Sequence, residues 1–113
     1  MSRDLLLYLR DMRDACAAVE AHASGLSRKE LFADTKALHA TLWNLTVLGE
    51  AAKRVPDALR SQHPSVEWRK IAGLRDVVVH GYFGIDEDII WSVVSTKIEP
   101  LREALEQILA TND

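Results

Sequence analysis

The sequence predicts an all-α fold, and three observations support this. Apolar residues recur at steps of three and four over four long stretches, the spacing that lines one face of an α-helix. Serine or aspartate stands at the start of several stretches, and glycine or proline at the end. The β-prone run at residues 77–79 has no second strand to pair with. We therefore expect an antiparallel bundle of four main helices plus short helical turns.

The first half of the chain contains two of these long helices. The first is expected over residues 2–24, with Ser2 as its cap and Gly25 after its end. A capping box at Ser27–Glu30 predicts a short helical turn, because each end can satisfy the other's backbone donor. The second long helix should begin after Asp34 and end before Pro56, since proline removes a backbone donor.

The second half contains the other two long helices. Residues 56–64 read as a short helical turn and a loop, and a third helix is expected over roughly residues 66–80. The acidic run Asp86–Asp88 suits the N-terminus of the last helix, where the helix dipole favours negative charge. We expect that helix to kink near Pro100.

Size and composition indicate one globular domain over residues 1–113. Hydrophobic residues make up 48% of the chain, enough for a core, and charged residues make up 27%. The single cysteine, Cys16, excludes an internal disulfide and favours a reducing compartment. No signal peptide or apolar run of spanning length is found, so we expect a cytoplasmic protein with no membrane partner.

Positive charge is concentrated in one segment of an acidic chain. The formal net charge is −3, yet residues 53–75 carry six lysines and arginines against two carboxylates, a local charge of +4. This segment is either a solvated basic face or a surface that binds an anion such as phosphate. The sequence alone leaves both interpretations open.

Metal and cysteine chemistry find no support in the sequence. Cys16 lies on the apolar stripe of the first helix, which favours a place in the core over a role as nucleophile. Gly49 falls inside a helix, where it permits close helix packing. We predict no metal and no cofactor, because no metal-ligand spacing links the histidines, which are His22, His39, His63 and His80.

One short segment does carry candidate chemistry. Arg75, Asp76, His80 and Tyr82 lie within eight residues, and Glu50 is available from the neighbouring helix. Histidine moves protons near neutral pH, and an arginine beside it can hold a phosphate. These two groups suffice for RNA cleavage without metal: a base removes the 2′-hydroxyl proton, and that oxygen attacks the adjacent phosphorus.

The spacing within this segment leaves several arrangements open. On one straight helix Arg75 and His80 would point about 140° apart. The helix could end near His80, the long arginine could curl round, or two copies of the chain could pool their motifs. Alternatively, Arg75 simply pairs with Asp76 or Glu50, and His80 ends a helix.

Three segments together resemble a known family. Arg75 and His80 match the R-x4-6-H motif of HEPN domains, small all-α proteins that are often metal-independent RNases. The ordered combination of LGEAAKRVP (48–56), WRKIAGLRDVVVHGYFGID (68–86) and DEDIIWSVV (86–94) resembles the HepT toxin family over essentially the whole chain. One departure is that many members have an arginine near the middle of the second long helix, where this chain has Trp43 and Asn44.

This resemblance implies a specific function. It implies a HEPN fold and a homodimer in which Arg75 and His80 of both subunits line one cleft and cleave RNA, with Asp76 and Glu50 as supporting residues. It also implies the toxin role in a type VII (HepT/MntA) toxin–antitoxin system, in which an MntA-type nucleotidyltransferase antitoxin transfers AMP to Tyr82. The alternatives are a non-catalytic HEPN module that binds a nucleotide or serves as partner subunit of a nucleotidyltransferase, and a plain helical dimerisation protein.

Overall fold

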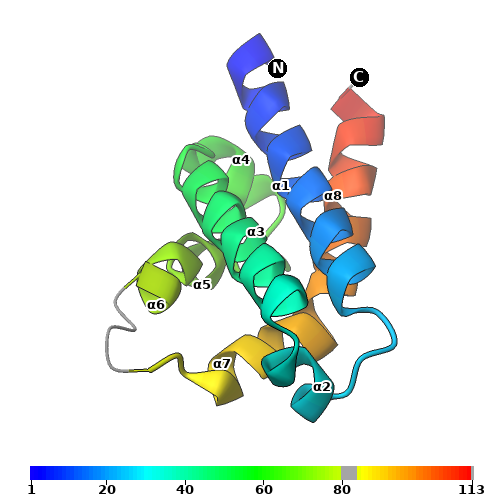
Figure 1. The fold of residues 1–113 in the computed structure, drawn as a ribbon. Helices are drawn as coiled ribbons and strands as arrows, with labels where there is room; N and C mark the ends of the chain where they lie inside the picture. The colour runs from blue at the N-terminus through cyan, green and yellow to red at the C-terminus, as the bar shows by residue number, and fades with distance from the viewer. Residues whose placement is uncertain (80–83, 113) are drawn as a thin grey trace.

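The computed structural model describes residues 1–79 and 84–112, and every regular element in them is a helix (Figure 1). This confirms the all-α prediction. None of the described helices is both long and apolar enough to cross a membrane. The elements are α1 (Arg3–Ala23), α2 (Arg28–Ala33), α3 (Thr35–Lys53), α4 (Asp57–Gln62), α5 (Trp68–Ala72), α6 (Leu74–Val79), α7 (Glu87–Ser92), the π-helical η1 (Val93–Lys97) and α8 (Ile98–Asn112).

The first three helices begin where the capping residues predict. The Ser2 hydroxyl accepts a hydrogen bond from the Leu5 amide at 3.2 Å. Ser27 and Glu30 form the complete capping box of α2, each side chain accepting from the other's backbone. The Asp34 carboxylate accepts from the Ala37 amide at 3.0 Å and so caps α3. These bonds satisfy amides that have no partner within the helix.

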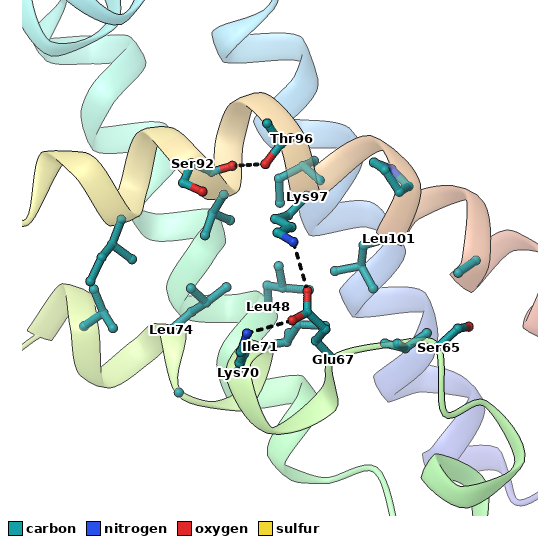
Figure 2. Close-up of a pocket in the computed structure, with 18 of the residues that line it drawn as sticks. Leu48, Ser65, Glu67, Lys70, Ile71, Leu74, Ser92, Thr96, Lys97 and Leu101 are labelled. Atoms are coloured by element: carbon teal, nitrogen blue, oxygen red, sulfur yellow. Dashed lines mark hydrogen bonds and ion pairs between the residues drawn. The ribbon is translucent and has the colours of Figure 1, made fainter.

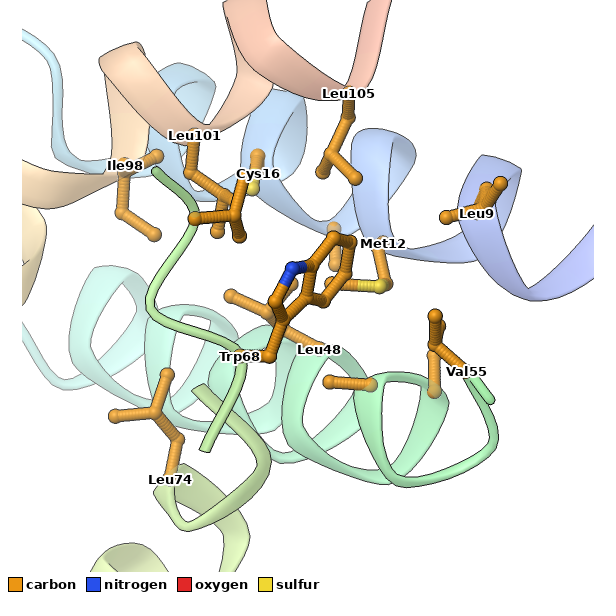
Figure 3. Packing of buried hydrophobic residues seen from close by; sticks show 14 of the residues in the cluster. Leu9, Met12, Cys16, Leu48, Val55, Trp68, Leu74, Ile98, Leu101 and Leu105 are labelled. Carbon is orange, nitrogen blue, oxygen red and sulfur yellow. The ribbon is translucent and has the colours of Figure 1, made fainter. Parts of the chain in front are cut away.

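The core lies where α1, α3 and α8 meet. In Figure 1 α1 lies between α3 and α8. Apolar residues of all three helices are buried in one core cluster. The indole of Trp68 lies near Met12 and Leu48 in Figure 3, and its Nε1 donates to the His63 carbonyl at 3.0 Å. Burying a tryptophan with its one polar atom satisfied anchors α5 to the bundle.

The third predicted helix is divided in two, so its prediction as one continuous helix was wrong. α5 ends at Ala72 and α6 begins at Leu74, with Gly73 between them. The Gly73 amide is shared between the carbonyls of Arg69 (3.1 Å) and Lys70 (3.2 Å), which tightens the last turn. The Gly73 carbonyl in turn accepts from two later amides, so the chain changes direction without losing its backbone bonds.

The last predicted helix also contains an irregularity, but it is a π-helical turn ahead of Pro100. The Ile98 amide bonds to the Val93 carbonyl, five residues back, as a π-helix requires. The hydroxyls of Ser95 and Thr96 each donate to a carbonyl four residues earlier, at 2.6 Å. Pro100 follows this turn closely and lies between helical residues on both sides, so the ladder lacks the backbone donor that another residue would supply there.

Candidate functional site

Gly49 brings α6 directly against α3. A Cβ atom at this position would lie 2.8 Å from the backbone nitrogen of Arg75 and 3.2 Å from the carbonyl oxygen of Ile71. Both neighbours are backbone atoms and cannot swing away, so only glycine fits here. Gly49 therefore permits close helix packing, as the sequence suggested, and the residue that it admits is Arg75.

Arg75 lies in a cluster of four charged side chains from α3 and α6. Its Nε is 3.2 Å from Glu50 Oε1, and its Nη1 is 3.4 Å from Asp76 Oδ1. Lys53 Nζ lies 3.7 Å from the same Glu50 oxygen and 3.8 Å from the same Asp76 oxygen. Two carboxylates from different helices therefore hold Arg75 and Lys53 side by side.

This charged cluster is a surface feature. The side chains of Arg75 and Glu50 are 39% and 49% exposed. Ion pairs at such exposure contribute about 0–1 kcal/mol each to folding, because water and salt screen them. The cluster instead orients Arg75. Carboxylates hold its guanidinium from two sides, and part of the side chain remains exposed to solvent.

The structure thus brings three of the five predicted site residues together. Arg75, Asp76 and Glu50 are in contact, which confirms that Arg75 pairs with both carboxylates. His80 and Tyr82 lie outside the described residues. α6 is described as far as Val79, five residues before Gly84, where the described chain resumes.

The valines before His80 differ from one another in burial. Val77 and Val78 are half-buried and pack against the core. Val79, however, is 36% exposed. On a short helix lying on the bundle surface, three consecutive residues cannot all face inward.

Most cations of the basic segment, residues 53–75, bind other groups of the same chain. Arg60 donates to the carbonyls of Ala52 (2.8 Å) and Val55 (3.0 Å), so it satisfies the C-terminal end of α3. Lys70 pairs with Glu67 at 2.9 Å. With Lys53 and Arg75 in the cluster, Arg54 and Arg69 are the two cations of this segment for which the described residues show neither an ion pair nor a side-chain hydrogen bond. Few cations of this segment therefore remain available to bind an anion such as phosphate, and they lie near Arg75.

The sequence interpretation missed two residues of this surface. Lys53 contacts both carboxylates of the cluster, and its place three residues after Glu50 is a usual helical pairing distance that could have indicated it. Trp43 is 68% exposed on α3. Trp43 lies off the apolar stripe of α3, five residues after Leu38 and two before Leu45, and this spacing could have indicated an exposed side chain. Asn44 beside it is structural, donating to the Ala40 carbonyl at 2.8 Å.

A groove of about 840 Å³ lies between α5–α6 and the α7–η1–α8 segment (Figure 2). Its lining is mainly apolar, with Leu48 and Leu74 among the residues. Glu67 forms ion pairs with Lys70 and with Lys97, the latter at 3.2 Å, and these lysines hold the pKa of Glu67 below its usual value. The bridge from Glu67 to Lys97 ties α5 to η1 across the groove.

Cys16 is buried in the core, as predicted. Burial raises the pKa of its thiol to about 12, with the charge of Glu20 acting in the same direction. The thiol therefore stays protonated near neutral pH and is a poor nucleophile. Among the side chains in residues 1–79 and 84–112, no three of the histidine, cysteine or carboxylate type lie close enough together to hold a metal ion.

Comparison with known proteins gives the chain a family. The family model for ribonuclease HepT-like proteins matches residues 12–108. A probable ribonuclease HepT of Thermococcus cleftensis is 31% identical over 108 residues, covering 96% of this chain and 98% of the relative. A protein of Caldanaerobacter subterraneus subsp. tengcongensis, provisionally named as an RNase, is 32% identical over 102 residues, covering 90% and 91%.

A third relative, from Methanocaldococcus jannaschii and also provisionally named as an RNase, is 31% identical over 107 residues, covering 95% of this chain and 88% of its own. No solved structure matches the chain. The matched segment contains α3, α6 and the whole charged cluster around Arg75. The chain therefore belongs to the ribonuclease HepT-like family, whose members are ribonucleases of the HEPN type.

Proposed function

We propose that this protein is a metal-independent endoribonuclease whose catalytic residues are Arg75 and His80. The observation that carries the proposal is the fixed position of Arg75. Carboxylates of Glu50 on α3 and Asp76 on α6 hold its guanidinium at the surface, five residues before His80 in the sequence. An arginine oriented in this way can contact a phosphate without first losing the freedom of a long side chain.

The proposed reaction needs only groups that the chain supplies. His80 would remove the proton from a ribose 2′-hydroxyl, and that oxygen would attack the neighbouring phosphorus as the bond to the 5′-oxygen breaks. A second histidine of the same kind, or the same one after proton exchange, would protonate the leaving oxygen. Arg75 would stabilise the negative charge that grows on the phosphoryl oxygens.

A homodimer would complete this site. Each chain has one Arg75 and one His80, and two copies related by a twofold axis would place two of each along one cleft. The prediction is a particle of twice the chain mass of 12.7 kDa. Light scattering at micromolar concentration tests it, and a monomer that still cleaves RNA would contradict a shared site.

The proposal also includes regulation of the enzyme by a partner protein. We propose that the chain is the toxin of a HepT/MntA (type VII) pair and acts on RNA in the cytoplasm. An MntA-type nucleotidyltransferase would transfer AMP to Tyr82: the phenol oxygen attacks the α-phosphorus of ATP, pyrophosphate leaves, and the phenolic proton is released. Because Tyr82 is two residues after His80, each AMP would place a negative phosphate near Arg75 and repel RNA.

A second candidate function rests on the same cluster. Arg75 already has two carboxylate partners, so a phosphate must compete with Glu50 and Asp76 for it. This favours a non-catalytic module that serves as the partner subunit of a nucleotidyltransferase. An RNA cleavage assay with a metal chelator present separates the two candidates. The enzyme cleaves under these conditions, whereas the non-catalytic module leaves RNA intact and binds only its partner.

A further inference from the structure

Trp43 has the largest exposed fraction of any large hydrophobic side chain described. It is 68% exposed, compared with 46% for Met1, 43% for Leu7, 42% for Ile89 and 36% for Val79. Tryptophan is a residue that folding normally covers, as it covers Trp68 in this chain. A single exposed apolar residue does not by itself indicate a site, so the position of Trp43 decides its meaning.

Trp43 lies on the face of α3 that bears the charged cluster. Seven helical residues turn about 700° and rise about 10.5 Å, so Trp43 and Glu50 differ by about 20° around the helix axis. Glu50 is the residue that holds Arg75. The indole ring therefore lies in line with the candidate catalytic arginine, two helical turns away along α3.

This face of α3 also carries positive charge. Lys36 precedes Trp43 by seven residues and so lies in the same row, and Arg54 follows Glu50 by one turn. Both are exposed, and neither has an acidic partner among the described residues. The charged side chains of this row and the cluster are the cations Lys36, Lys53, Arg54 and Arg75 and the carboxylates Glu50 and Asp76.

The excess of cations distinguishes between possible occupants of this face. The homodimer proposed above would bring Arg75 of two copies to one cleft, and this adds cations there without supplying an anionic partner for them. A nucleic-acid strand supplies a polyanionic backbone for the cations and a flat π-surface for the indole. Cations for the backbone and an exposed indole for a base both lie in one row of α3.

We propose that Trp43 is a stacking platform for an unpaired base of the RNA substrate, and that it sets the enzyme's preference for single-stranded RNA. The proposal rests on the proposed ribonuclease function. Because the rise from Trp43 to Glu50 is about 10.5 Å, this base would lie within a few nucleotides of the phosphate held by Arg75. Paired bases are already stacked inside a duplex, so they would not reach the ring.

The test compares Trp43→Ala, Trp43→Phe and the control Leu7→Ala, which removes a similarly exposed hydrophobic side chain from α1. The substrate is a short unstructured RNA, offered intact and as a series with one abasic nucleotide at each position. We expect Trp43→Ala to lower kcat/KM by about 10-fold. Trp43→Phe should stay within about threefold of the unmodified enzyme, and Leu7→Ala should be unchanged.

The abasic series gives a readout that a purely structural role would not move. One abasic position, within a few nucleotides of the cleaved bond, should slow the unmodified enzyme about as much as Trp43→Ala does. The same abasic RNA should not slow cleavage by the Trp43→Ala variant any further, because the ring and the base form a single contact. Equal cleavage of the intact RNA by both proteins would overturn the stacking role and leave the ribonuclease function standing.

Two further outcomes are informative. If light scattering shows that Trp43→Ala changes the size of the particle, Trp43 serves contact between copies and the proposal is wrong. If the unmodified protein cleaves no RNA, the proposed function is wrong. The stacking role of Trp43 is then tested by RNA binding alone. Single-stranded RNA should then quench the fluorescence of the exposed indole, and this quenching should be lost in Trp43→Phe; no quenching would overturn the platform as well.

Discussion

Arg75 Nε lies 3.2 Å from Glu50 Oε1, so a carboxylate on α3 fixes the arginine that α6 presents. The residue before Glu50 is Gly49, whose missing side chain leaves the space that the Arg75 backbone occupies. Two consecutive residues of α3 therefore determine where Arg75 lies, one by leaving room for its backbone and the other by pairing with its guanidinium.

Replacing Glu50 with Gln should lower kcat for RNA cleavage by about 10-fold, because a neutral amide holds the guanidinium less firmly. The melting temperature should hardly move, since exposed ion pairs contribute little to folding. Glu103→Gln, an exposed carboxylate on α8, is the matched control and should leave kcat unchanged. Full activity in Glu50→Gln would show that Glu50 does not position Arg75.

Replacing Gly49 with Ala should lower the free energy of unfolding by about 1–3 kcal/mol, because the new methyl group meets backbone atoms. Gly73→Ala is the matched comparison. Its Cβ would meet its nearest atom at an ordinary 3.5 Å, and its φ of −79° suits any residue. That change should be neutral or raise stability by up to about 1 kcal/mol. Urea unfolding measures both, and equal effects would contradict the packing described here.

The Cys16 thiol should resist alkylation at pH 8 in the folded protein and react at once in urea, because burial raises its pKa to about 12. The same shift has a consequence for stability. The unfolded chain releases this proton near its ordinary pKa of 9.0, so this contribution is fully present below that pH and is lost as pH rises toward 12. Rapid labelling of the native protein would contradict burial of the thiol.

Co-expression with a neighbouring nucleotidyltransferase should add the mass of one or more AMP units to the chain, as measured by intact-mass spectrometry. Tyr82→Phe should show no increment and should stay active in the presence of the partner, because it lacks the phenol oxygen that accepts AMP. An unmodified chain that is nevertheless inhibited would point to simple occlusion by the partner instead.

The sequence predicts the helices well because their caps are local. Ser2, Ser27 and Asp34 each satisfy an amide three residues away, so the signal and the structure lie in the same few residues. The break at Gly73 was missed because it lies where α3 closely approaches Ile71 and Arg75, a contact that the sequence does not display. The π-turn at Val93–Lys97 was also missed.

The candidate site was partly predictable for the same reason. Arg75 and its two carboxylates were named from spacing and from one neighbouring helix. The sequence did not indicate that Arg60 and Lys70 bind groups of the same chain, because a count of charges does not reveal their partners. The exposure of Val79 was also missed, because a run of valines is usually buried. The exposure of Trp43 could have been predicted, because Trp43 lies off the apolar stripe of α3.

The most direct test of the central claim is cleavage of single-stranded RNA, with excess chelator, by the unmodified protein, Arg75→Ala and His80→Ala. Circular dichroism and melting temperature establish that each variant is folded. We predict cleavage by the unmodified protein and a loss of at least about 100-fold in each variant, the scale of removing a group that contacts the reacting atoms. Cleavage by His80→Ala or Arg75→Ala at the unmodified rate would contradict the account.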